Sequence, residues 1–149
     1  MQRRWTVWLA VLGTVAFLLG VPALAADKAP DATISLSEGS VAAGIGWSWG
    51  RGDLSFQGKT YRVKVEGLSV AEVGITSAEA SGNVYNLKSV DDLNGVYAAA
   101  GAEGTAGKGV GYSSLRNSKG VVINLKSETK GANLKIAASG LKITVEPSQ

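Results

Sequence analysis

The 149-residue chain contains no histidine and no cysteine. Without imidazole or thiolate side chains it cannot form the Ser-His-Asp or Cys-His arrangements of nucleophilic enzymes, and nearly all zinc sites are excluded as well. The lack of cysteine also removes disulfides, so the hydrophobic core and hydrogen bonds have to stabilise the fold. The sequence therefore predicts a non-enzymatic protein with no metal site and no cofactor.

The reactive groups that remain form no specific catalytic motif. Asp91 and Asp92 are the only adjacent acidic pair in the sequence, and aspartate is strongly favoured in turns and at helix N-termini. Gly107-Lys108-Gly109 contains the lysine of a phosphate-binding loop but lacks the flanking residues that such a loop requires. A hydrolase that uses Ser and Lys is left as a remote alternative.

Residues 1–25 have the pattern of a secretory signal peptide. Arg3 and Arg4 give a positive start, residues 7–21 form an apolar run, and Ala23-Leu24-Ala25 matches the small-x-small cleavage pattern. An uncleaved membrane anchor is the alternative, but the apolar run is shorter than the ~20 residues that span a bilayer. We therefore expect cleavage after this pattern and export to the periplasm of a Gram-negative bacterium. No cysteine follows, so the chain is not a lipoprotein.

The mature chain is expected to be nearly neutral. Of the 149 residues, 25 belong to the signal peptide, which leaves 124. The 15 basic residues fall to 13 because Arg3 and Arg4 are removed, and all 12 acidic residues stay. With its lysines scattered, the chain has neither the basic patch of a nucleic-acid-binding protein nor the cluster that binds anionic membranes.

Short β-type runs separated by Gly, Asn, Asp and Ser fill the rest of the sequence. After a flexible lead over residues 26–32, we expect a single all-β domain over residues 33–146. Residues 57–59, Gln-Gly-Lys, mark a hairpin turn, and after it Tyr61, Val63 and Val65 alternate with charged residues. The fold class predicted is a small antiparallel barrel or sandwich of about eight or nine strands.

The last third of the sequence contains three further strand patterns. They cover residues 120–126, 132–137 and 141–145, with glycine in each intervening turn. This regular spacing predicts an antiparallel meander. Residues 90–93 are expected to form a single helical turn.

Residues 44–54 alternate strictly between two residue classes. A strand would place Gly44, Gly46, Ser48, Gly50 and Gly52 on one face, and Ile45, Trp47, Trp49, Arg51 and Asp53 on the other. Such a glycine row suits close packing or strong curvature, with a bend or turn near residues 51–53. The two indoles fill the core or form an apolar wall for a ligand. The candidate ligand-binding residues are Trp47, Trp49, Gly44, Gly46, Gly50 and Gly52.

Residues 43–54, Ala-Gly-Ile-Gly-Trp-Ser-Trp-Gly-Arg-Gly-Asp-Leu, resemble the glycine-rich opening of SYLF-type lipid-binding domains. Residues 117–125 are loosely similar to later strands of those domains, and small exported envelope proteins of uncharacterised families have similar glycine-paired patterns. The resemblance implies binding to a lipid or membrane surface rather than catalysis. The positions that match are Gly44, Gly46, Gly50, Gly52 and the strand near Gly120.

Together these patterns predict an exported, non-enzymatic cell-envelope protein that binds a lipid or another apolar ligand. Seven aromatic residues in the mature chain are too few for the two aromatic girdles of an outer-membrane barrel, so we expect no membrane-spanning part once the chain is processed. The alternative is a protein-interaction or assembly subunit that binds an envelope protein through a sheet edge.

Overall fold

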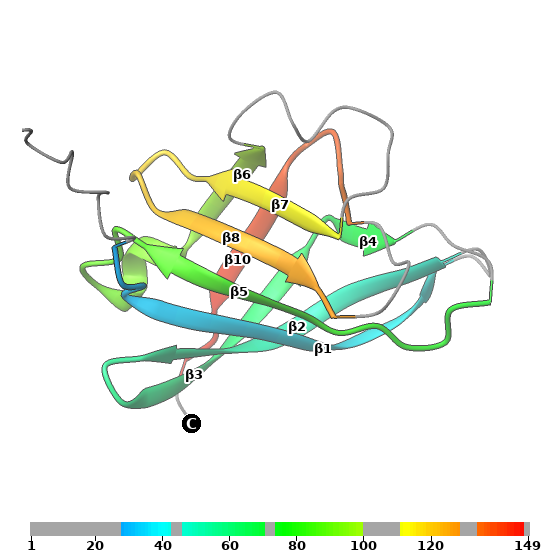
Figure 1. Ribbon diagram of the computed structural model, residues 1–149, viewed down its shortest axis with the longest axis horizontal. Helices are drawn as coiled ribbons and strands as arrows, with labels where there is room; N and C mark the ends of the chain where they lie inside the picture. The colour runs from blue at the N-terminus through cyan, green and yellow to red at the C-terminus, as the bar shows by residue number, and fades with distance from the viewer. Residues whose placement is uncertain (1–27, 43–45, 71–73, 100–110, 129–133, 148–149) are drawn as a thin grey trace, which may run out of the picture.

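A computed structural model describes residues 28–42, 46–70, 74–99, 111–128 and 134–147 (Figure 1). The expected signal peptide over residues 1–25 and the candidate site residue Gly44 lie outside this part, as does most of the glycine-rich stretch before Tyr112.

The described part consists of strands and one short 3₁₀ turn. The strands are β1 (Ala32–Ala42), β2 (Gly46–Phe56), β3 (Lys59–Glu66), β4 (Leu68–Val70), β5 (Ala80–Tyr85), β6 (Gly95–Ala99), β7 (Tyr112–Arg116), β8 (Val122–Ser127), β9 (Lys135–Ile136) and β10 (Leu141–Val145). The turn is η1 (Val90–Leu93), which confirms the predicted helical turn.

Eight of these strands close into an antiparallel barrel. Their order is β1-β5-β8-β7-β6-β10-β3-β2, and β2 pairs with β1 to complete the circle. The two short strands β4 and β9 extend the sheet beyond β2. Figure 1 shows β1, β5, β8 and β7 side by side on one wall, with β10 crossing behind them. The predicted all-β class is confirmed, and of its two forms the barrel is the one that occurs.

The hairpin between β2 and β3 has the turn that the sequence predicts. Gln57 and Gly58 have φ angles of 50° and 75°, and Phe56 lies opposite Lys59. Two successive residues with positive φ are the mark of a type I′ turn, whose twist matches that of the strands on either side.

The predicted C-terminal meander is wrong, although its strands exist. β8 pairs with β5 and β7, β9 pairs with β4, and β10 lies between β3 and β6. Glycine turns determine where a strand ends, but not which strand it lies beside. In this barrel β10 is placed by non-local pairs, such as Ile143 opposite Val65 and Leu141 opposite Tyr97.

The strict alternation predicted for residues 44–54 is also wrong. β2 runs through to Phe56 without a turn at residues 51–53, and its buried side changes part of the way along. Before Gly50 in the sequence the odd-numbered Trp49 is buried, whereas after it the even-numbered Gly52 and Leu54 are buried. The pairing explains the change: Leu36 lies opposite Gly52 and Gly39 opposite Trp49.

Between these two pairs Glu38 lies opposite Arg51, which leaves Ser37 on β1 and Gly50 on β2 without a place in the register. An unpaired residue of this kind forms a β-bulge, and it moves the later side chains of its strand to the opposite face. Arg51 and Asp53 therefore leave the face that carries the tryptophans and point to solvent.

Apolar side chains fill the interior of the barrel. The largest that are almost fully buried are Trp49, Tyr97, Ile34, Leu36, Leu54, Leu68, Leu93, Leu115, Ile123, Leu125, Leu141 and Ile143. They belong to one cluster that includes residues from all eight barrel strands. An eight-stranded barrel has an interior just wide enough for its own side chains. The described interior is a packed core.

Polar groups are bonded where η1 meets the barrel. The Tyr97 hydroxyl donates to the carbonyl oxygen of Leu93 at 2.7 Å, and Asn117 Nδ2 donates to the carbonyl oxygen of Asp92 at 2.9 Å. The other side of the Asn117 amide, Oδ1, accepts from the Val121 backbone amide at 3.0 Å. These bonds hold η1 against the barrel and satisfy both ends of the Asn117 side chain.

The two glycines beside the bulge give a matched test of the packing. A Cβ on Gly52 would overlap the Leu36 side chain and the Ser35 carbonyl, whereas a Cβ on Gly50 would meet nothing within 4 Å. We expect Gly52→Ala to lower the free energy of unfolding by about 1–3 kcal/mol and Gly50→Ala to change it by less than about 0.5 kcal/mol. Urea unfolding measures both, and equal effects would contradict the register.

A second prediction concerns pH. Burial raises the pKa of Tyr97 above its ordinary value of 10.0, so the folded protein keeps a proton that the unfolded chain releases. This contribution to stability is complete below pH ~10 and is lost as the pH rises from there, by at most about 1.4 kcal/mol per pH unit. Tyr97→Phe should flatten the decline above pH ~10. Unfolding curves measured from pH 8 to 11 that fall equally in both proteins would contradict the assignment.

Candidate functional site on the outer wall of the barrel

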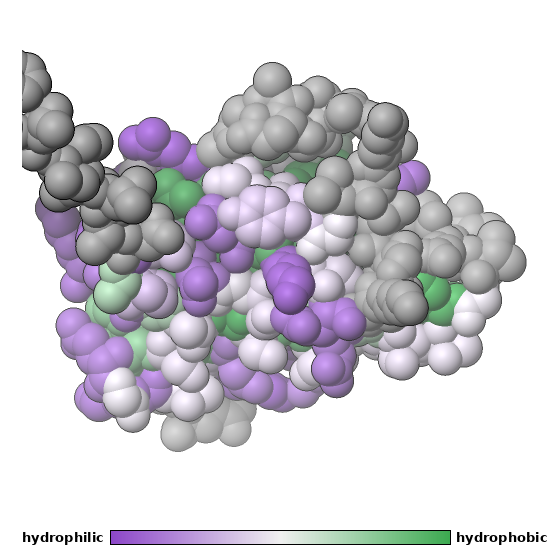
Figure 2. All heavy atoms as spheres, viewed as in Figure 1, coloured by the Kyte–Doolittle hydropathy of each residue, from purple (hydrophilic) through white to green (hydrophobic). Residues whose placement is uncertain are grey.

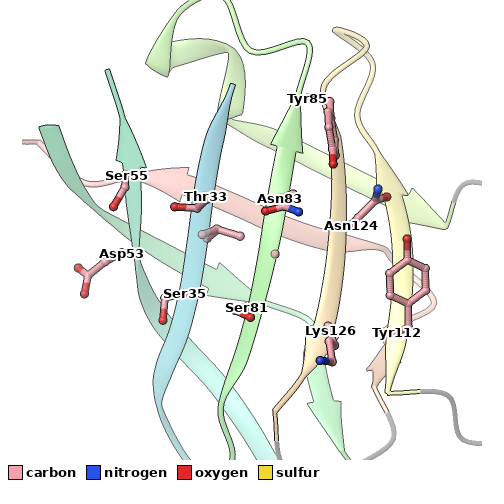
Figure 3. Close-up of a pocket in the computed structure, with 12 residues that line it drawn as sticks. Thr33, Ser35, Asp53, Ser55, Ser81, Asn83, Tyr85, Tyr112, Asn124 and Lys126 are labelled. Carbon is pink, nitrogen blue, oxygen red and sulfur yellow. The ribbon is translucent and has the colours of Figure 1, made fainter. Parts of the chain in front are cut away.

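A hollow lies on the outside of the barrel. It has a volume of about 520 Å³ and crosses β2, β1, β5, β8 and β7. We call it the trough. It is lined by Thr33, Ile34, Ser35, Asp53, Ser55, Ser81, Gly82, Asn83, Tyr85, Tyr112, Asn124 and Lys126 (Figure 3).

Strand alternation explains why polar side chains face the trough. On β1 the residues Ala32, Ile34 and Leu36 are buried in the core, so Thr33 and Ser35 between them point outward. The same rule turns the even-numbered positions of β8 outward, because Ile123 and Leu125 occupy the core. Figure 2 shows the result: the wall over these strands is mostly purple and white, with little green.

The strand register sets these side chains in two rows that run across the barrel wall. Directly opposite neighbours in an antiparallel sheet lie on the same face, about 4.5–5.5 Å apart. The first row, which we call the amide row, consists of Ser55, Thr33, Asn83, Asn124 and Ser114. The second, which we call the charged row, consists of Asp53, Ser35, Ser81, Lys126 and Tyr112.

One amide in the first row is held in a fixed orientation. Ser114 Oγ donates to Asn124 Oδ1 at 2.9 Å. This bond occupies Oδ1, and no partner for the NH₂ group of Asn124 occurs in the described part of the chain. Asn83 lies directly opposite Asn124 on β5. Two neighbouring carboxamides therefore offer donors and acceptors at the same point of the wall.

The charged row contains one acidic and one basic side chain. Asp53 accepts from Arg62 Nη1 at 3.2 Å, and Arg62 Nη2 also donates to Glu38 at 2.6 Å. The hydrogen bonds to Glu38 and then to Asp53 raise the pKa of the Arg62 guanidinium. Lys126 lies across the trough from Asp53. The row as a whole carries no strong charge of either sign.

Two tyrosines stand on the β8 side of the trough. Tyr85 is partly buried, and Tyr112 is 49% exposed, which makes it one of three exposed large hydrophobic residues in the described part. Figure 3 shows their rings on either side of Asn124. An aromatic ring beside carboxamides is the arrangement of a binding surface, because it supplies apolar contact together with directed hydrogen bonds.

The tryptophans predicted to bind a ligand lie in the core. Trp49 is 1% exposed and its Nε1 donates to the carbonyl oxygen of Ala78 at 3.0 Å. Trp47 is 8% exposed, and its buried Nε1 has no hydrogen-bond partner in the described residues. Of the two interpretations that the sequence left open for this pair, core packing is what the structure shows. Binding of a ligand there stays a prediction.

The candidate glycines do not gather on one bare face. Gly46 and Gly52 are buried, and Gly50 is exposed at the bulge. Gly52 lets β1 approach β2 closely, since its inner side is occupied by Leu36. Gly120, near the strand that the SYLF resemblance matched, has a φ of 85° in the turn before β8. Its role is to reverse the chain.

Sequence analysis missed the residues of the trough. Thr33, Asn83 and Asn124 are far apart in the sequence and belong to no motif. They come together only through the pairings of β1 with β5 and of β5 with β8. The outward positions of each strand were a usable signal, but the sequence does not reveal their neighbours across the sheet.

The described residues contain no group of three or more His, Cys, Asp and Glu side chains that could hold a metal ion. Within the same ranges, no helix has the length and apolar character needed to cross a bilayer.

Comparison with solved structures supports the fold. The chain is similar to an uncharacterised β-barrel-like protein from Brucella abortus, with a TM-score of 0.51 and 18% sequence identity. The match covers 80% of this chain and 74% of the other. No protein-family model and no curated protein matches the sequence. The SYLF resemblance thus receives no support from these comparisons, and what is shown is a likeness in fold to a β-barrel of uncharacterised function.

Proposed function

We propose that this chain is an exported, non-enzymatic binding protein of the cell envelope whose ligand lies in the trough. The observation that supports this most directly is the alignment of polar side chains and two tyrosines over one hollow of about 520 Å³. Binding sites are typically concave, with a few convergent polar groups beside apolar or aromatic ones. Export is proposed from the signal-peptide pattern of residues 1–25.

The packed interior favours a ligand on the outside. Barrels that enclose a ligand need a cavity, and here large side chains such as Trp49 and Tyr97 occupy the centre. The outer wall, in contrast, has free donors and acceptors on neighbouring strands. Because these strands are paired on both sides, the wall is rigid, and a preformed surface loses little entropy when a ligand binds.

The trough is better suited to binding than to catalysis. Ser81 Oγ donates to Glu128 Oε1 at 2.5 Å, but this carboxylate is exposed. Asp53 is already bonded to Arg62. These side chains can orient a ligand, which supports binding as the proposed role.

Photo-crosslinking inside the cell tests the proposal whatever the identity of the ligand. A benzoylphenylalanine is introduced at Ser35 in the trough or, as the control, at Thr144, which is exposed on β10 across the barrel. We expect adducts from position 35 only. The chain should be recovered from the periplasm, with a mass that corresponds to a chain starting at Ala26. Equal adducts from both positions, or none from position 35, would overturn the proposal.

An apolar ligand near Trp47 is the second candidate. It is favoured by Val41, an apolar side chain that lies opposite Trp47 and is 48% exposed. In this case phospholipid vesicles or a fatty acid should shift the emission of the mature protein toward shorter wavelengths, because the indole environment becomes drier. The shift should disappear in Trp47→Phe. Unchanged emission with both lipids would remove this candidate.

A further inference from the structure

We propose that the ligand of the trough is a glycan, specifically an uncharged linear oligosaccharide of pyranose rings that lies across the strands along the amide row. This inference rests on the proposed function, since it names the class of ligand for the same site. Three properties of the trough lead to it: the aromatic rings, the neutral hydrogen-bonding groups and the lack of a free strand edge.

The tyrosines provide surfaces for sugar rings. A pyranose has a face of C–H groups and a rim of hydroxyls. The C–H face packs against the electron-rich face of an aromatic ring, while the rim is left free for hydrogen bonds. Tyr112 is half exposed, and Figure 3 shows its ring on β7, beside Asn124 and Lys126. An exposed ring gains most from such a contact, because apolar surface is removed from water.

The amide row provides partners for hydroxyl groups. Each sugar hydroxyl both donates and accepts, so it is best bound by groups that also do both. Asn83, Thr33 and Ser55 have this property, and no bond from their side chains occurs in the described part of the chain. The hydrogen bond from Ser114 fixes the Asn124 carboxamide, so its NH₂ group is left to donate to a ligand.

The charges near the trough favour a neutral ligand over a polyanion. A nucleic acid or an anionic polymer needs a track of positive side chains. In the lining only Lys126 is basic, and Asp53 is acidic. Asp53 is further neutralised by Arg62, with which it forms an ion pair at 3.2 Å. An uncharged chain fits this surface better than a phosphate-rich one.

The closed sheet argues against a peptide ligand. Peptides commonly bind to sheets by adding a strand to a free edge. The strands β1, β5 and β8 each have a partner on both sides, so their backbone groups are already bonded. A ligand of the trough can be bound only through side chains. The amide row is four strand spacings long, or ~19 Å, which suits an oligosaccharide rather than a single sugar.

The test is calorimetric titration of the mature protein with three soluble probes: cellohexaose, maltohexaose and the hexamer of β-1,4-linked N-acetylglucosamine. We expect at least one to bind. Tyr112→Ala should weaken that binding about tenfold, which corresponds to ~1.4 kcal/mol. Tyr112→Phe keeps the ring and should bind within about twofold of the original protein. The matched control is Val96→Ala, because Val96 is 54% exposed on β6 outside the trough, and this variant should bind like the original protein.

Unfolding curves identify any variant that is not folded, and in that event Asn124→Ala replaces it with the same expected loss. Failure of all three probes to bind, or binding that Tyr112→Ala leaves unchanged, would overturn the glycan inference. If adducts still form at position 35 in that case, the trough has another ligand and the proposed function stands. If those adducts are missing too, both proposals fail.

Discussion

The pairing of β1 with both β5 and β2 is the constraint on which the rest of the structure depends. Through it, the sheet closes and its interior is filled by the buried side chains of eight strands. It also places Thr33 between Ser55 and Asn83, so that the polar positions of separate strands become one continuous row. If β1 had a free side, the core would be open and the amide row would be divided.

The paired bulge at Ser37 and Gly50 makes this closure compatible with the sequence. A regular strand from Gly46 to Phe56 that buried Trp49 would also bury Arg51 and Asp53. The bulge reverses the faces between them, so that Trp49 and Leu54 both lie in the core. Asp53 is then free to reach Arg62 on the outer wall. The unpaired residue on each strand thus lets the apolar side chains of β2 face the core while its charged side chains face solvent.

Local chemistry in the sequence was enough to predict the fold class and several elements. The hairpin turn follows from Gly58, since glycine accepts positive φ, and the alternation of Tyr61, Val63 and Val65 with charges identifies β3. The bulge could not be predicted, because two strands share it and neither sequence shows it alone. The trough was missed for the same reason: Asn83 and Asn124 become neighbours only through a register set by the whole barrel.

In this barrel β1 is paired on both sides, in the register that builds the amide row. Nuclear Overhauser effects between backbone protons measure this pairing directly in the isolated protein. We expect contacts from Thr33 to Ser55 on β2 and, in the same molecule, from Thr33 to Asn83 on β5. Contacts to only one of these partners, with fast amide exchange along the other side of β1, would show that the sheet is open and that the amide row does not form.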